Sequence, residues 1–211
     1  MNSSRIEHAK DSILKQMYGL KQLLNSIENK SDIYSEIILS CMPILISNYK
    51  RRIIFSGVGK NANIASKAAE TFASLGIPSM ALNACHYSHG DAGFVGPSDI
   101  VIHLSRSGKT DELVFMAKHL KRLRPDVTQM LLHCNNDLVP DESFDVVFGI
   151  DDITESDANA LAPTTSTTVL LALVDSIGCY LSKSVSFTPE DFYSFHPGGS
   201  LGKMLATKDV V

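Results

Sequence analysis

Two segments combine serine, glycine and lysine in a pattern suited to binding a phosphate group. The first, SGVGKNAN, covers residues 56–63, and the second, SRSGKTDE, covers residues 105–112. Each stands where a strand is expected to end and a helix to begin, so free backbone N–H groups and the positive end of the helix dipole would face a ligand. The hydroxyl groups of Ser105, Ser107 and Thr110 offer further donors. A plain tight turn is the alternative for each segment, and finding two of them in one chain favours phosphate binding.

Neither segment carries a nucleotide fingerprint. The GxxxxGK[ST] spacing of a P-loop is missing from both. The dinucleotide pattern GxGxxG is also incomplete, because Ala62 occupies the place of the third glycine. No redox cofactor is indicated.

The loop NACHYSHGDAGFVGP, residues 83–97, gathers Cys85, His86, His89 and Asp91. A Cys-His-x-x-His arrangement could be part of a metal site, but a zinc signature needs a fourth ligand at a fixed spacing. We therefore expect no metal here. A place for His89 in a substrate pocket is the favoured interpretation.

Two further candidates lie towards the C-terminus. The run PTTSTT is rich in hydroxyl groups for a helix start, and capping by Thr164 or Thr165 accounts for part of it. Glu155 lies upstream, where it could reach the same cleft. His196 precedes Pro197 and two glycines, which is compatible with an active-site histidine and equally with a histidine that only completes a turn.

The elements that must position these residues alternate between strands and helices. Strands are predicted at 51–57, 78–82, 99–105, 127–134 and 144–150. Helices are predicted at 65–76, 111–123 and 164–182, with a short one from Thr188. Continuous apolar strands separated by helices are typical of a parallel sheet that is covered on both faces. We therefore expect an α/β fold with a doubly wound five-stranded parallel sheet and right-handed crossovers, and a ligand beyond the carboxyl ends of its strands.

The first fifty residues are predicted to form two amphipathic helices. An apolar stripe at spacings of three and four is formed by Ile6, Ala9, Ile13, Met17, Leu20, Leu24 and Ile27. The second helix follows Ser31-Asp32, and Pro43 is expected to bend or interrupt it. These helices could cover the core or form a subunit interface. The predicted division is N-terminal helices at 1–48, the main domain at 49–205 and a tail at 206–211.

Composition narrows the class of protein. Among 211 residues the formal net charge is −4, with 44% hydrophobic and 20% charged residues. This balance argues against a broad surface for nucleic acid or anionic membrane, and no apolar run approaches the ~18 residues of a membrane span. The N-terminus lacks the apolar stretch of a signal peptide. The four cysteines are dispersed, which favours free thiols, and Cys134 and Cys179 are expected in the core. We expect a soluble cytoplasmic protein.

Four segments, taken together and in this order, resemble the sugar isomerase (SIS) domain family. They are SGVGKNANIASKAAETFASLGIPS, HGDAGFVGPSDIVIHLSRSGKTDEL, LAPTTSTT and HPGGSLGKML. The last two are similar to the arabinose 5-phosphate isomerase branch. The resemblance implies the interconversion of D-ribulose 5-phosphate and D-arabinose 5-phosphate, which feeds Kdo synthesis for lipopolysaccharide or capsule. It also implies a homotetramer with active sites shared between subunits.

The positions that the family uses carry over onto this chain residue by residue. Those implied to be catalytic are Lys60, His89, Glu112, Glu155 and His196. An enediol route needs an acid–base pair and stabilisation of charge on the substrate oxygens. We assign charge stabilisation to Lys60 and acid–base work first to Glu155 and His196, with His89 and Glu112 as the other candidates. The expected substrate-binding residues are Ser56, Gly57, Ser105, Ser107 and Thr110.

The chain departs from the family pattern in two side chains and in length. Lys109 and His86 stand where the family usually has glutamate, so the identity of the sugar is less constrained than the reaction class. The family commonly continues into a pair of CBS modules, about where this sequence stops. Two alternatives follow: a non-catalytic SIS module that senses a sugar phosphate or nucleotide sugar, and an isomerase of another sugar phosphate.

Overall fold

Five short strands form a parallel sheet in the order β2-β1-β3-β4-β5. The computed structural model describes residues 2–197. The strands are β1 Ile53–Gly57, β2 Ser79–Asn83, β3 Ile100–Ser105, β4 Thr128–His133 and β5 Val146–Gly149. Strands β1 and β3 are buried along their whole length, as continuous apolar strands in a sheet covered on both faces should be. The predicted α/β fold with five parallel strands is confirmed.

Helices precede and connect the strands. They are α1 Asn2–Asn29, α2 Ser31–Leu45, α3 Lys60–Ser74, α4 Ala84–Tyr87, α5 Asp111–Leu123, α6 Thr165–Ser184 and α7 Pro189–Phe195, with a 3₁₀ turn η1 at Asp91–Phe94. Helix α5 has the predicted bounds. Helix α3 begins five residues before the predicted start, directly after the first glycine-rich turn.

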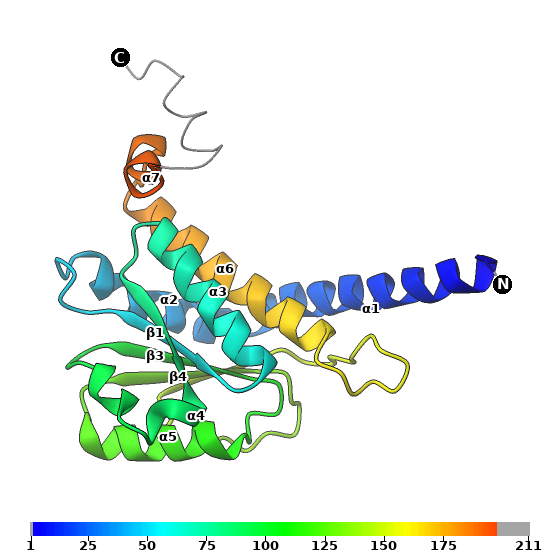
Figure 1. Ribbon diagram of the computed structural model, residues 1–211, viewed down its shortest axis with the longest axis horizontal. Coiled ribbons are helices and arrows are strands. Elements are labelled where there is room, and N and C mark those ends of the chain that lie inside the picture. Colours follow the sequence, from blue (N-terminus) through cyan, green and yellow to red (C-terminus); the bar gives the residue numbers. More distant parts are fainter. Residues whose placement is uncertain (1, 198–211) are drawn as a thin grey trace.

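The helices form a layer on each face of the sheet (Figure 1). Helices α2, α3 and α6 share one face, where Ile37, Phe72 and Val174 belong to the larger hydrophobic cluster. Helices α4 and α5 cover the other face, where Tyr87 and Met116 belong to a second cluster. The two clusters hold the sheet rigidly between them and fix the strand ends that carry the polar turns.

The strand order reverses between β1 and β3. From β1 the chain proceeds to β2 at one edge, then returns to β3 and continues outward through β4 to β5. Gly57 at the end of β1 lies in register with Leu104 of β3. Parallel open sheets place ligands outside the carboxyl ends of the strands at such a reversal. The fold therefore brings the two predicted phosphate turns together.

The predicted apolar stripe of α1 is mostly exposed. Ile13 and Met17 each expose 58% of their surface, whereas Leu23, on another face of the helix, is buried. Helix α1 contacts α6 through a close approach of Gly19 to Thr165 and a 2.8 Å hydrogen bond from the Thr168 hydroxyl to Gln16. Its N-terminal half extends away from the rest of the molecule (Figure 1). The stripe thus does not cover the core of its own chain.

Two local predictions require correction. Pro43 does not interrupt the second helix, which continues to Leu45, because buried Cys41 and Ile44 anchor this last turn. Cys179 is exposed rather than in the core, while Cys134 is buried as predicted. All four cysteines are free thiols.

Helix α6 is long and apolar enough to cross a membrane by length and composition alone. Most of that apolar surface is buried inside the domain, against α1, α2 and α3. Its composition is thus that of a core helix.

The predicted boundary between residues 48 and 49 falls in the turn between α2 and β1, and the predicted tail at 206–211 lies outside the described residues.

Candidate functional site

The first turn joins β1 to α3 by a tight path that only glycine allows. A Cβ atom on Gly57 would lie 2.6 Å from the backbone carbonyl of Asn61. Gly59 has a φ of 59° and precedes the first helical residue, Lys60. The exposed Lys60 therefore stands at the carboxyl edge of the sheet, at the N-terminus of α3.

Ser56 does not reach this edge. It is fully buried, and its hydroxyl donates to the sulfur of Met116 over 3.4 Å. The Ser56 hydroxyl is therefore not presented at the carboxyl edge, and a role for Ser56 in binding the substrate phosphate stays a prediction. Strand alternation is the physical reason, because the side chain of Ser56 points from β1 into the layer of α5.

The second turn is shaped by its own hydroxyl groups. The Ser105 Oγ accepts from the Gly108 N–H at 3.0 Å and lies 2.9 Å from the Thr110 hydroxyl. The Ser107 Oγ accepts from the Lys109 N–H at 3.1 Å. Each hydroxyl also carries one hydrogen, so Ser107 and one member of the Ser105–Thr110 pair keep a donor for a ligand. The same hydroxyl groups can therefore hold the turn in shape through their oxygens and donate their hydrogens to a ligand.

Glu112 stands in the first turn of α5, directly after the second turn, and is exposed. Lys60 and Glu112 therefore flank the strand reversal from opposite faces of the sheet. These two predicted residues, together with Gly57, Ser105, Ser107 and Thr110, are brought to one edge by β1 and β3.

Glu155 is fully buried and held by several donors. Its Oε2 accepts from the Thr164 N–H at 2.8 Å, the Thr164 hydroxyl at 3.1 Å and the Ser166 N–H at 3.1 Å. These groups belong to the N-terminus of α6, so the carboxylate caps that helix. Burial pushes the pKa of Glu155 upwards, but the hydrogen bonds from Ser166 and Thr164 outweigh it and hold the pKa below its ordinary value.

This environment does not suit a general base. A base that works near neutral pH needs a pKa near 7 and a free lone pair, whereas Glu155 is a stabilised carboxylate whose Oε1 lies 2.9 Å from the Arg106 Nε. Glu155 is connected to the second turn through its ion pair with Arg106, and its part in the site stays a prediction.

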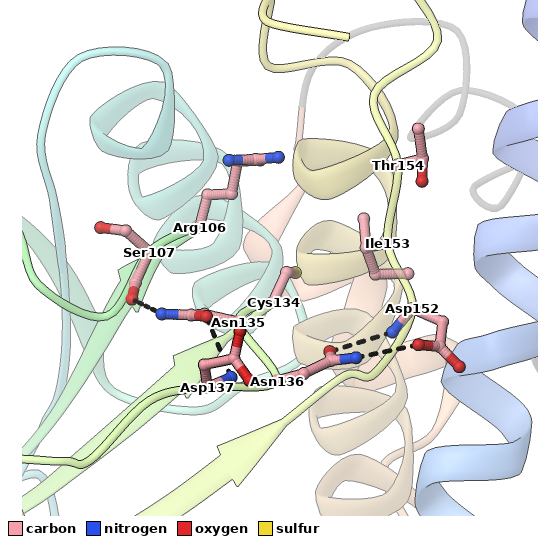
Figure 2. Close-up of a pocket in the computed structure, with 9 residues that line it drawn as sticks. All are labelled: Arg106, Ser107, Cys134, Asn135, Asn136, Asp137, Asp152, Ile153 and Thr154. Carbon is pink, nitrogen blue, oxygen red and sulfur yellow. Dashed lines mark hydrogen bonds between the residues drawn. The ribbon is translucent and has the colours of Figure 1, made fainter.

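Arg106 is the residue that the sequence reasoning missed. It lies between Ser105 and Ser107, and its backbone carbonyl accepts from the Cys134 N–H at 3.0 Å. Its side chain lines a cavity of about 380 Å³ beyond the ends of β3, β4 and β5 (Figure 2). An arginine inside a phosphate-type turn was a usable signal, because a guanidinium pairs well with phosphate.

The opposite wall of this cavity is fixed by a reciprocal pair. The Asn136 side chain donates to the Asp152 carboxylate at 2.8 Å and accepts from the Asp152 N–H at 3.1 Å (Figure 2). Asn135 in turn donates to the Ser107 carbonyl at 2.9 Å. The cavity therefore has a preformed polar lining that continues into the second turn.

His89 is exposed and follows α4, on the β2 side of the reversal. Its backbone N–H donates to the His86 carbonyl at 2.9 Å, which closes the turn. His86 and Asp91 line a separate cavity of about 310 Å³ between α3 and this loop. Within residues 2–197 no group of three or more His, Cys, Asp or Glu side chains could hold a metal ion.

His196 lies far from the other candidates within one chain. Its ring stacks on Phe192, and its Nε2 lies 3.2 Å from the Ser74 hydroxyl at the C-terminus of α3. Lys60 stands at the opposite end of the same helix, which at 1.5 Å per residue is roughly 21 Å away. The residues from Gly198 onwards, which include the glycines of the HPGG motif, lie outside the described part.

Comparison with known proteins now places the chain. The SIS domain family matches residues 45–178. Arabinose 5-phosphate isomerase KpsF of Escherichia coli is 37% identical over 164 residues, which are 78% of this chain and 51% of that protein. A probable arabinose 5-phosphate isomerase of Haemophilus influenzae is 36% identical over 95% of this chain and 56% of its own length. The chain thus spans about half the length of these curated relatives.

A solved structure resembles the chain over nearly its whole length. It is a protein of Escherichia coli CFT073 in complex with arabinose 5-phosphate, with a TM-score of 0.81 and 29% identity, covering 93% of this chain and 100% of that one. The parallel sheet, the reversal between β1 and β3 and the glycine- and serine-rich turns at that point agree with the family match. The chain belongs to the SIS domain family.

Proposed function

We propose that the protein is an aldose–ketose isomerase that interconverts D-ribulose 5-phosphate and D-arabinose 5-phosphate. The observation that carries the proposal is the similarity to the Escherichia coli CFT073 protein in complex with arabinose 5-phosphate, which extends over all of that chain. The two turns at the strand reversal supply the donors that a sugar phosphate needs. The product would feed Kdo synthesis for lipopolysaccharide or capsule, and we expect the enzyme to work in the cytoplasm.

The geometry supports a division of labour among the site residues. Ser105, Ser107 and Thr110, with the N–H groups at the start of α5, would bind the phosphate. Lys60 would stabilise negative charge on the oxygens of the enediolate that forms when a proton leaves the sugar carbon. No cofactor is needed for this proton transfer. Glu112 is an exposed carboxylate in the first turn of α5, directly after the second turn, and we assign it to the acid–base pair in place of Glu155.

The remaining acid–base groups are proposed to come from neighbouring subunits. His196 lies at the wrong end of α3 to serve the site of its own chain, and the exposed stripe of α1 offers a surface for association. A homotetramer with shared sites would bring His196 or His89 of another copy to Lys60. The sugar phosphate is the only ligand that we propose for this assembly.

The proposal is tested by following ribulose 5-phosphate with the protein in D₂O by NMR. Arabinose 5-phosphate should appear with deuterium at C2, because the enediol exchanges its proton with solvent. A Glu112→Gln variant should slow the conversion, and a Glu142→Gln variant serves as the matched control, because Glu142 is an exposed carboxylate outside the proposed acid–base pair and outside the cavity that Arg106 lines. Binding of ribulose 5-phosphate without conversion would overturn the proposed reaction and favour a sensor or another substrate.

A further inference from the structure

The SRSGKT turn holds a cation whose terminal nitrogens have no protein partner among the described residues. The Nε of Arg106 forms an ion pair with the Glu155 Oε1 at 2.9 Å, and no hydrogen bond within residues 2–197 engages its Nη1 and Nη2 atoms. The side chain is 46% exposed, so these atoms remain accessible. A guanidinium fixed at Nε presents its two terminal nitrogens as a fork, which matches two oxygens of a phosphate.

Glu155 gives Arg106 a fixed direction. Its other oxygen is fastened to the N-terminus of α6 by bonds from Thr164 and Ser166, and the carboxylate is completely buried. A buried carboxylate in this state costs stability unless a cation balances it. The backbone of Arg106 is fixed as well, by the hydrogen bond between its carbonyl and Cys134. The backbone and the Nε of Arg106 are therefore both held in place, and only its Nη1 and Nη2 atoms are left for a ligand.

Arg106 and Ser107 are adjacent residues of the turn and border the same space. Both residues line the cavity of about 380 Å³, and Asp152, Ile153 and Thr154 form its other side (Figure 2). The Ser107 hydroxyl keeps a donor, because its oxygen only accepts in the turn. A phosphate at Ser107 would therefore lie within reach of Arg106.

We propose that Arg106 binds the phosphate group of the sugar phosphate and that Glu155 is the positioning residue that holds it there. This inference rests on the proposed function, and it gives Glu155 a role that acts through Arg106 rather than on the substrate carbon. The phosphate gains a charged, bidentate partner beside the neutral donors of the turn. Pentoses without a phosphate group would gain no affinity from Arg106.

The test is the dissociation constant of two probes, arabinose 5-phosphate and inorganic phosphate, measured by calorimetry. Arg106→Met should weaken the binding of both by about 10- to 100-fold, the range of a charged hydrogen bond. Arg106→Lys should lose less, because it keeps the charge but not the fork. Arg122→Met, an exposed arginine near the other end of α5, is the matched control and should bind like the wild type.

Glu155→Gln separates positioning from catalysis. If Glu155 acts through Arg106, this variant raises KM and the dissociation constants, and the Arg106→Met/Glu155→Gln double variant loses no more than Arg106→Met alone. In Glu155→Gln the fall of kcat towards low pH should then occur at the same pH as in the wild type. A lower kcat with unchanged binding, and with loss of this fall towards low pH, would make Glu155 a general base and overturn the positioning role.

Folding is followed in parallel by thermal unfolding, since Arg106→Met leaves a buried carboxylate unpaired. Arg106→Lys retains the charge and the double variant removes both charges, so at least these two report on binding. Wild-type affinity in Arg106→Lys and in the double variant would overturn the proposal, as would a wild-type protein that binds neither probe. Binding that depends on Arg106 without any conversion of ribulose 5-phosphate would support this inference and refute only the proposed reaction.

Discussion

At the scale of single residues, Lys60 shows how the backbone places a functional group. It is the first residue of α3, fully within reach of solvent, and it follows a glycine with positive φ. Its ammonium group adds a positive charge where the helix N-terminus already favours anions. This is the arrangement required to stabilise an enediolate.

Lys60→Met should therefore reduce kcat strongly. Removal of one preorganised donor to a developing oxyanion typically costs about 10²–10³ in kcat. The measurement is the steady-state rate of ribulose 5-phosphate conversion. Lys50→Met, at an exposed lysine in the turn before β1, is the control and should keep the wild-type rate. An equal effect of the two substitutions would exclude Lys60 from the mechanism.

His103 predicts how stability depends on pH. It is completely buried on β3, its Nε2 lies 3.1 Å from the Gln129 Oε1, and burial lowers its pKa to about 4. In the unfolded chain the same group titrates near 6.5, so the unfolded state takes up a proton first as pH falls. Stability is therefore complete above about pH 7 and declines by a few kcal/mol towards pH 4.

Urea unfolding between pH 7 and pH 4 measures this slope. His103→Gln should make it shallower, because glutamine does not titrate and can still donate to Gln129. Part of the slope should remain, since burial followed by the charge of Lys30 lowers the pKa of His133 to about 4 as well. His86→Gln, at an exposed position, is the control. A slope that is the same in all three proteins would contradict the assignment.

The sequence indicated which residue types gather at the candidate site better than it indicated what each side chain contacts there. The serine- and glycine-rich turns were recognisable because their residues lie close together in the sequence. That the Ser56 hydroxyl meets Met116, or that Glu155 is paired with Arg106, depends on contacts between residues about fifty to sixty positions apart. Such contacts leave no periodic signal in the chain. Arg106 itself stood in a recognisable turn, but its pairing with Glu155 could not be read from the sequence for the same reason.

At the scale of secondary structure, hydrophobic periodicity predicted nearly every element. Helix α5 has the predicted bounds because Leu113, Met116 and Leu120 repeat at helical spacing. The predicted start of α3 was late, since its first turn, Lys60 to Asn63, carries no core side chain and only the end of the glycine turn marks it. Periodicity thus locates the buried part of a helix, while the functional N-terminal turn is fixed by backbone geometry.

Gly57→Ala tests the contact between β1 and α3. The new Cβ would collide with the backbone of Asn61, which cannot move without shifting the N-terminus of α3. We expect a loss of about 1–3 kcal/mol in the free energy of unfolding, and a lower kcat because Lys60 moves with the helix. Denaturant unfolding and the rate assay measure the two effects.

Gly93→Ala is the matched control for this substitution. A Cβ at Gly93 meets no atom within 4 Å, and its φ is not positive. The control should unfold like the wild type. If the two alanine variants were equally stable, the close packing of the first turn would not be needed for the position of α3.

At the scale of the whole molecule, α1 presents an apolar surface that residues 2–197 leave without a partner. The predicted apolar stripe is present on α1, but its side chains face solvent. Ile13, Leu14 and Met17 are each more than half exposed. A sequence pattern cannot tell whether such a stripe faces its own domain or another copy. We therefore propose the second of the two predicted roles for these helices, a subunit interface.

An Ile13→Glu/Met17→Glu variant should therefore form smaller assemblies. Two charges in the apolar stripe cannot be buried between subunits without a large desolvation cost. The substitutions should leave the fold of each chain intact, because both side chains are exposed in it. Size-exclusion chromatography with light scattering gives the mass, and circular dichroism confirms folding. Lys21→Glu, an exposed polar position on the same helix, should keep the wild-type mass. An unchanged mass in the double variant would remove α1 from the interface.

The packing of α1 on α6 also has a consequence for synthesis on the ribosome. Helix α1 ends at Asn29, but the helix against which it packs most extensively, α6, begins only at Thr165. At about 5–20 residues per second, α1 waits on the order of ten seconds before α6 is made. During that time both its inner and its outer apolar faces are bare. The nascent chain should therefore be most prone to aggregate, and most dependent on chaperones, before this late helix emerges.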